Sequence, residues 1–262
     1  MVRSKPGENL IGSLPILMYH QIVAAEPEDI HAVRIEAFES QIVWLREQGY
    51  ESVTVEEQFI DQASAQPGSS LRRIAITFDD GYLDAFTNAL PILKKYNFKA
   101  TLFLVAKRVG CVNDWDQAPG LRGAPLLDWH HINEMVDHGI NFGAHTCTHP
   151  DLTAIPAWQA EEEIRDSRRI IEDRLQTPIR AFSYPYSRFD ESIVKMVAEN
   201  GYYCACTYAP GYVGDAGKQR FLLQRTGILA TDTLEDFAGK VQARLRWKFR
   251  KYWRAYRYLL KN

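Results

Sequence analysis

Apolar runs alternate along this chain with stretches in which apolar and polar residues recur at helical spacing. Short apolar or β-branched runs, typical of buried strands, occupy 15–20, 52–55, 73–78, 100–106, 140–145, 179–185 and 202–208, with another near 220–224. Helical spacing occurs in 36–48, 84–96, 128–138, 156–175 and 190–199. This alternation of strand and helix predicts a mainly parallel sheet, either closed into a barrel or open and doubly wound.

The length and the absence of internal repeats favour a single α/β domain. The chain has 262 residues, and α/β barrels of about this length form one domain. No low-complexity segment or linker divides it. We therefore expect an N-terminal extension at 1–13, one α/β domain at 14–235 and a C-terminal helix at 236–262.

The charge is distributed unevenly, although the net charge is only −2. Residues 240–261 include nine basic residues and no acidic one, so the rest of the chain, with 22 basic and 33 acidic residues, carries −11. Apolar and aromatic residues fall on one stripe of this segment, which predicts a basic amphipathic helix. Such a helix can contact an anionic membrane surface, pack on the barrel or contact nucleic acid. We favour peripheral membrane contact and expect no nucleic-acid partner.

The cysteine content and the N-terminal sequence indicate where in the cell the protein is located. The four cysteines include no CxxC pair and are too few for a disulfide framework in a chain of this length. The first apolar run is short and is broken by Gly12, Ser13 and Pro15, which argues against a signal peptide or a spanning helix. These features predict a cytoplasmic protein, peripheral at the inner face of the membrane.

Two groups of polar residues follow predicted strands and suggest a metal site. Asp79 and Asp80 come directly after the strand at 73–78, and adjacent carboxylates repel unless their roles differ. His145 and His149 follow another strand, at a spacing that suits one face of a helix or a turn. Two imidazoles and one carboxylate form a ligand set for Zn²⁺ or a similar cation, with coordination positions left for water and substrate. One aspartate would bind the cation and the other would transfer protons.

Three motifs resemble those of the polysaccharide deacetylases, carbohydrate esterases with a nodulation-deacetylase-like domain. These are "TFDDGY" at 77–82, "HTCTHPDL" at 145–152 and "RAFSYPYSRFD" at 180–190, and the wider resemblance covers most of 14 to about 228. It implies a distorted (β/α) barrel with seven strands. It also implies a divalent metal, which we expect to be Zn²⁺, with Co²⁺ or Ni²⁺ as alternatives.

The resemblance implies roles for individual residues. Asp79 would be the general base, and Arg180 would hold and orient it. The metal would be bound by Asp80, His145 and His149, and the Tyr186 backbone N–H would face the oxyanion. Without the other motifs, Arg180 reads as a surface ion-pairing residue and 183–187 as a loop governed by proline.

A general acid is missing from its usual place. Many family members carry a histidine near the C-terminal end of the domain, but all seven histidines here lie at or before position 149. Members that act on poly-N-acetylglucosamine carry it in a "YH" after the first strand, which "ILMYH" resembles. We therefore expect His20 to be the general acid, the alternative being a histidine bonded to backbone at the edge of the core. His31 is expected to be solvated.

The remaining site residues and the function follow from this resemblance. Trp115 and Asp116, in a long loop at 111–125, and Tyr184 are expected to contact substrate, although Trp115 could instead pack its loop down. The implied activity is metal-dependent N-deacetylation of a GlcNAc-containing bacterial exopolysaccharide or lipid-linked glycan. The alternatives are an amidohydrolase of a small non-glycan amide, and a non-catalytic glycan or membrane adaptor on a degenerate barrel.

Overall fold

The computed structural model describes residues 14–57, 72–208 and 220–242. Its strands are β1 (Ile16–Tyr19), β2 (Gln21–Val23), β3 (Ala32–Arg34), β4 (Tyr50–Val53), β5 (Arg72–Phe78), β6 (Ala100–Leu104), β7 (Ile140–Ala144), β8 (Ala181–Ser183), β9 (Cys204–Thr207), β10 (Leu223–Gln224) and β11 (Thr226–Gly227). Its α-helices are α1 (Ile35–Glu47), α3 (Leu90–Tyr96), α4 (Trp129–Val136), α5 (Ala157–Leu175), α6 (Glu191–Glu199) and α7 (Leu234–Val241). A π-helical turn, η2 (Ala85–Ala89), leads into α3, and the 3₁₀ turns η3 (Ala106–Arg108) and η4 (Pro185–Ser187) follow β6 and β8.

The main sheet is parallel and curls into a nearly closed barrel. Its order is β10-β9-β8-β7-β6-β5-β1-β11, and β4 pairs with β5 outside this path. β10 and β11 stand at the two ends of the order, yet only Arg225 separates them in the chain. The segment 223–227 therefore pairs with β9 through its first half and with β1 through its second half, and it closes the ring.

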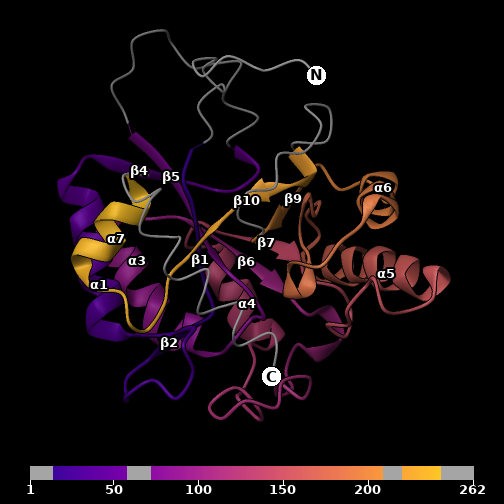
Figure 1. The fold of residues 1–262 in the computed structure, drawn as a ribbon, viewed down its shortest axis with the longest axis horizontal. Helices are drawn as coiled ribbons and strands as arrows, with labels where there is room; N and C mark the ends of the chain where they lie inside the picture. The colour runs from indigo at the N-terminus through magenta and orange to yellow at the C-terminus, as the bar shows by residue number, and fades with distance from the viewer. Residues whose placement is uncertain (1–13, 58–71, 209–219, 243–262) are drawn as a thin grey trace, which may run out of the picture.

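Helices surround this barrel, as Figure 1 shows for α1, α3 and α7 on one side and α5 and α6 on the other. The largest apolar cluster joins outward-facing strand residues to helix residues, for example Leu17 and Ile76 to Phe38 and Ile164. This confirms the prediction of a single-domain α/β barrel built from a parallel sheet.

The short parallel pair of β2 and β3 was not predicted, because three-residue strands carry too little alternation to be recognised. The predicted basic helix lies almost entirely outside the described residues, so its membrane contact stays a prediction. In the described part of the chain, no helix has the length and apolar character needed to cross a membrane.

Candidate metal-dependent active site

The strands of the barrel direct alternate side chains inward, and this phase determines which aspartate enters the barrel. Along β5, Ile76 and Phe78 pack outward against the helices, whereas Ala75 belongs to a small cluster made mostly of strand residues. Asp79 is in phase with Ala75, because strand side chains repeat every two residues. Its carboxylate therefore lies inside the barrel at the C-terminal end of β5, where the active sites of such folds are built.

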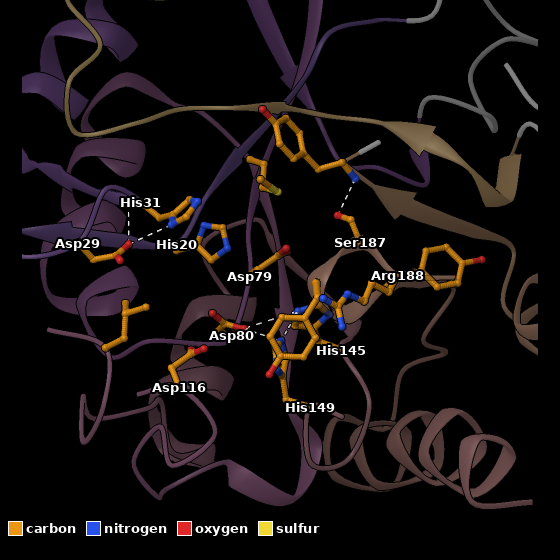
Figure 2. A pocket seen from close by; sticks show the side chains of 15 residues that line it. His20, Asp29, His31, Asp79, Asp80, Asp116, His145, His149, Ser187 and Arg188 are labelled. Atoms are coloured by element: carbon orange, nitrogen blue, oxygen red, sulfur yellow. Dashed lines mark hydrogen bonds and ion pairs between the residues drawn. The ribbon is translucent and has the colours of Figure 1, made fainter. Parts of the chain in front are cut away.

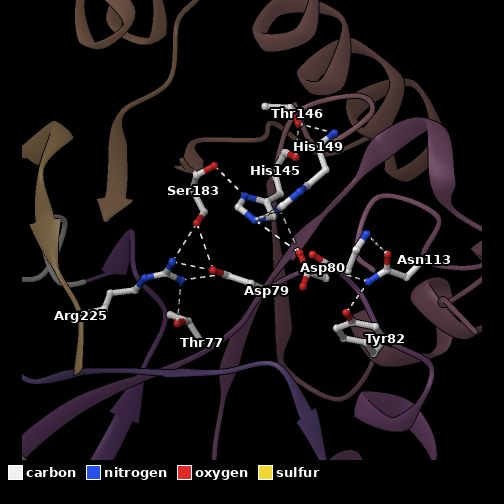
Figure 3. A network of polar contacts seen from close by, with 11 residues as sticks. Thr77, Asp79, Asp80, Tyr82, Asn113, His145, Thr146, His149, Ser183 and Arg225 are labelled. Atoms are coloured by element: carbon white, nitrogen blue, oxygen red, sulfur yellow. Dashed lines mark hydrogen bonds and ion pairs between the residues drawn. The ribbon is translucent and has the colours of Figure 1, made fainter. Parts of the chain in front are cut away.

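Asp79 forms a buried bidentate ion pair with Arg225. The Nη1 and Nη2 atoms of Arg225 donate to Oδ1 and Oδ2 of Asp79 at 2.7 and 2.6 Å, and further bonds reach the hydroxyls of Thr77 and Ser183 (Figure 3). Both charged side chains are almost fully buried. Burial alone would raise the pKa of Asp79, but the Arg225 charge and hydrogen bonds hold it well below its usual range. Asp79 is therefore ionised and fixed in orientation.

The position of Arg225 corrects the role predicted for Arg180. Arg180 precedes β8 at the N-terminal end of the strand, and its side chain is exposed. Residues before a parallel strand and residues after one lie at opposite ends of the barrel, so Arg180 cannot orient Asp79. Sequence reasoning missed Arg225, although a lone arginine within the apolar stretch 221–228 was an available signal.

Replacing each arginine by methionine should distinguish the buried ion-pairing role of Arg225 from the exposed position of Arg180. Arg225→Met leaves the Asp79 charge buried without its partner, and we expect it to lower the free energy of unfolding by about 3–5 kcal/mol. Arg180→Met removes an exposed charge and should change the same quantity by no more than about 0.5 kcal/mol. Urea unfolding at pH 7 measures both. Equal effects of the two substitutions would contradict the assignment of Arg225.

A left-handed turn carries Asp80 away from its neighbour and towards two histidines. Asp80 and Gly81 both have positive φ, 70° and 76°, and a Cβ on Gly81 would come within 3.0 Å of the Leu104 side chain. This turn lets Asp79 face Arg225 while Asp80 faces the loop after β7. The two adjacent carboxylates thus point to different partners, as predicted from the repulsion between neighbouring charges.

His145 and His149 lie on a turn rather than on a helix, and both rings face Asp80. Oδ1 of Asp80 lies 3.6 Å from Nε2 of His145 and 3.4 Å from Nε2 of His149, and the two Nε2 atoms are 3.2 Å apart. Nδ1 of His145 donates to the Ser183 carbonyl oxygen at 2.7 Å, which leaves Nε2 to face the group. Burial lowers the pKa of both histidines, so they are neutral.

These three side chains fit a divalent cation. Their ligand atoms converge, all three residues are buried, and Oδ1 of Asp80 has no hydrogen-bond partner among the described residues. Neutral imidazoles with one carboxylate are the ligands that Zn²⁺ and related ions accept. The structure therefore brings the predicted metal ligands Asp80, His145 and His149 together.

Glu163 of α5 fixes the loop between the two histidines. Its buried carboxylate accepts hydrogen bonds from the backbone N–H groups of Cys147 and Thr148 and from the Thr148 hydroxyl, each at 2.8 Å. Sequence analysis did not select Glu163. Its helical spacing from Ala160 and Ile164 puts a charged residue among the apolar positions of one helix face, and this was an available signal.

Removing these bonds should weaken cation binding. We expect Glu163→Ala to raise the Kd for Zn²⁺ about 10- to 100-fold, the range typical of lost hydrogen bonds to metal ligands. Glu163→Gln can keep a hydrogen bond to each partner and should stay within about threefold of the wild type. Titration calorimetry measures the Kd, with the exposed neighbour Glu162→Ala as the control. Wild-type affinity in Glu163→Ala would show that the loop holds its shape without this carboxylate.

A cavity of about 420 Å³ opens over Asp79, Asp80 and the two histidines. His20, directly after β1, lines it, as do Asp29 and His31 from the segment between β2 and β3 (Figure 2). The structure therefore places the expected general acid in the same pocket as the expected base. His31, expected to be solvated, has a side chain that is 40% exposed, and it also lines the pocket.

The segment after β8 forms another wall of this cavity. Tyr186 lies at the pocket with φ 54°, and its ring contacts the His149 imidazole edge-on with centroids 4.6 Å apart. Tyr184 is buried, and its hydroxyl donates to the Phe221 carbonyl oxygen at 3.1 Å. The hydroxyl of Tyr184 is thus bonded to the backbone, but Tyr184 also lines the cavity, so its contact with substrate stays a prediction.

The loop at 111–125 contributes Asp116 and Leu121 to the pocket wall and places Trp115 behind that wall. Asp116 lines the cavity, and Nδ2 of the buried Asn113 donates to its carboxylate at 2.8 Å. Trp115 stacks on the His149 ring, with centroids 5.0 Å apart, and is not among the described residues that line the cavity. Its position therefore favours the alternative in which Trp115 packs its loop down, here on the His149 ring, and sugar contact by Trp115 stays a prediction.

Backbone strain is concentrated at this pocket. Seven non-glycine residues of the described chain have positive φ, and two of them, Asn97 and Gln176, end helices. The other five surround the cavity or belong to the histidine loop: Asp80, Thr146, His149, Tyr186 and Ser187. Positive φ costs energy for such residues and persists where the surroundings enforce it, which is typical of functional sites.

Comparison with known proteins identifies the chain's relatives. A family model described as polysaccharide deacetylase matches residues 68–205. A Bacillus subtilis protein named for polysaccharide deacetylation, YxkH, is 32% identical over 200 residues, which are 76% of this chain and 65% of that protein. The poly-β-1,6-N-acetyl-D-glucosamine N-deacetylase of Staphylococcus epidermidis is 28% identical over 183 residues, 65% of this chain and 59% of that protein.

Among solved structures, the deacetylase PplD of Streptococcus pyogenes, in complex with acetate, matches with a TM-score of 0.74 and 26% identity. The match covers 87% of this chain and 97% of that chain. The two curated relatives are longer, and the chain spans less than two thirds of the length of each.

Proposed function

Since this chain belongs to the polysaccharide deacetylase family, we propose that it is a metal-dependent hydrolase that removes N-acetyl groups from a glycan containing N-acetylglucosamine. The observation that carries the proposal is the convergence of Asp80, His145 and His149 beside the ionised Asp79 in one cavity. The relative named as a poly-β-1,6-N-acetyl-D-glucosamine N-deacetylase supports the choice of sugar. The acetate in the PplD complex supports acetate as the product.

The cation would be held by Asp80, His145 and His149. When bound, it supplies a Lewis acid that polarises the acetyl carbonyl and lowers the pKa of a water molecule towards about 7. Asp79 would accept a proton from the attacking water. Arg225 keeps Asp79 ionised and aims both of its oxygens, and Ser183 links this pair to the His145 ligand through its backbone carbonyl.

Two further groups would complete the reaction. The Tyr186 backbone N–H would stabilise the negative charge that develops on the carbonyl oxygen. His20, across the cavity, would protonate the amide nitrogen as the C–N bond breaks, because an amine leaves poorly without a proton. The products are acetate and a glycan with a free amino group.

A panel of acetylated compounds tests the proposed substrate class. Purified protein with Zn²⁺ or Co²⁺ is given β-1,6-linked and β-1,4-linked N-acetylglucosamine oligomers and N-acetylated linear amines, and acetate release is measured. The proposal predicts release from the sugar oligomers at least about tenfold faster than from linear amides, a difference of about 1.4 kcal/mol in transition-state binding. Faster release from the linear amides would favour the small-amide alternative.

A further inference from the structure

A second histidine, held by an aspartate, lies directly beside His20. Asp29 and His31 line the same wall of the cavity and come from the segment between β2 and β3. Figure 2 shows the His20 and His31 rings side by side, with Asp29 bonded to His31. The Ala230 N–H donates to the Ile30 carbonyl oxygen at 2.8 Å, which fixes this segment to the residues after β11. The proposed function assigns no role to Asp29 or His31.

Asp29 determines how the His31 ring is oriented and where its proton lies. Oδ1 of Asp29 lies 3.0 Å from Nδ1 of His31 and accepts the His31 backbone N–H at 2.8 Å. Burial alone would raise the pKa of Asp29, but the hydrogen bonds from His31 outweigh it and lower the pKa, so Asp29 is ionised. An ionised carboxylate next to Nδ1 keeps the proton on that nitrogen and leaves Nε2 as a hydrogen-bond acceptor.

His20 has a matching requirement. Its Nδ1 atom is buried and has no hydrogen-bond partner among the described residues, and a buried polar atom without a partner is costly. The His20 and His31 ring centroids are 5.0 Å apart. The His145 and His149 centroids are separated by 4.8 Å, and their nearest nitrogens by 3.2 Å. Since imidazole rings rotate within a broad torsional well, a His20–His31 hydrogen bond fits this spacing.

We propose that Asp29 and His31 are positioning residues that hold His20 as the proton donor to the leaving amine. In this arrangement Asp29 accepts from Nδ1–H of His31, and Nε2 of His31 accepts from Nδ1–H of His20. The proton on Nε2 of His20 then faces the cavity. This inference rests on the proposed function, in which His20 protonates the amide nitrogen.

The proton balance closes without any further reagent. As the C–N bond breaks, its electron pair stays on nitrogen and takes the proton from Nε2 of His20. Asp79 passes the proton that it took from water to solvent. His20 takes up a proton from solvent before the next turnover. Asp29 and His31 exchange no proton with the substrate, and their contribution is orientation and stabilisation of the charged His20 ring.

The burial of His20, together with the charges around it, explains why such support is needed. Burial lowers the pKa of His20 to about 3, His31 and Arg225 act in the same direction, and the Asp79 charge opposes them. A proton donor in this position needs an acceptor for its second N–H, because the imidazolium form carries two donors. Asp29 and His31 supply that acceptor and a negative charge behind it.

Two substrates with different leaving groups test the inference. An N-acetylglucosamine oligomer needs protonation of its amine, whereas 4-nitrophenyl acetate releases a stable phenolate and does not. We expect Asp29→Asn and His31→Ala each to lower kcat/KM for the amide about 10- to 100-fold, part of the usual contribution of a general acid. The loss on the ester should be at least about tenfold smaller. Exposed His130→Ala is the matched control.

A double-mutant cycle tests whether His31 acts through His20. In a His20→Ala background, His31→Ala should cost less than about twofold further on the amide, because the group that it supports is already absent. Equal losses on amide and ester, an undiminished effect in the His20→Ala background, or unchanged amide hydrolysis in His31→Ala would each overturn the inference. Asp29→Asn creates no cavity and serves if His31→Ala does not fold. Wild-type protein that hydrolyses neither substrate with a divalent cation would overturn the proposed function itself.

Discussion

Asp79→Asn is expected to lower kcat for acetate release about a thousandfold while the protein still binds one divalent cation per chain. The amide cannot accept the proton of the attacking water, and a general base contributes about 10²- to 10⁴-fold. Cation binding should survive, because Asp79 is directed towards Arg225 and away from the His145 and His149 rings. Calorimetric titration and acetate release on the same preparation measure both properties.

The buried Arg225 is a complication that this experiment must control. Asparagine leaves the guanidinium facing a neutral partner, so some loss of stability accompanies the substitution. A cation stoichiometry of one and a cooperative unfolding transition show that the tested protein is folded. A folded Asp79→Asn protein with more than a tenth of wild-type kcat would remove Asp79 from the reaction.

Asp80→Ala, a change at the neighbouring residue, is expected to weaken cation binding itself, which Asp79→Asn leaves intact. The substitution removes one of three converging ligands, and we expect the Kd for Zn²⁺ to rise at least about a thousandfold, or about 4 kcal/mol. Acetate release should be undetectable at micromolar Zn²⁺ and should return in part at millimolar Zn²⁺. The same calorimetric and acetate measurements apply. Wild-type cation affinity in Asp80→Ala would show that the cation is bound elsewhere.

The sequence predicts the local parts of this site well. Asp79 and Asp80 follow an apolar run that is typical of a buried strand, and His145 and His149 lie in one short motif after another strand. In a parallel barrel the C-terminal ends of the strands meet, so placing the four residues on strand ends is enough to predict that they converge. His20 enters the same cavity for the same reason.

The parts that depend on closure of the barrel could not be predicted this way. Arg225 reaches Asp79 across 146 positions of sequence, and it does so because 223–227 fills the gap between β9 and β1. No local pattern reveals which strand closes a ring, so the motif arginine, Arg180, was the natural choice and was wrong. His31 sits in a polar stretch without periodicity, and only the parallel pairing of β2 with β3, which aligns Gln21 with Ala32, places it beside His20.

The most direct test of this account is a titration of cation-free protein with Zn²⁺, followed by acetate release from a β-1,6-linked N-acetylglucosamine oligomer. The account predicts no release without the cation, and a rise that saturates at one equivalent per chain in the wild type but not in Asp80→Ala. Release that is undiminished by a chelator, or that requires no intact Asp80, would contradict it.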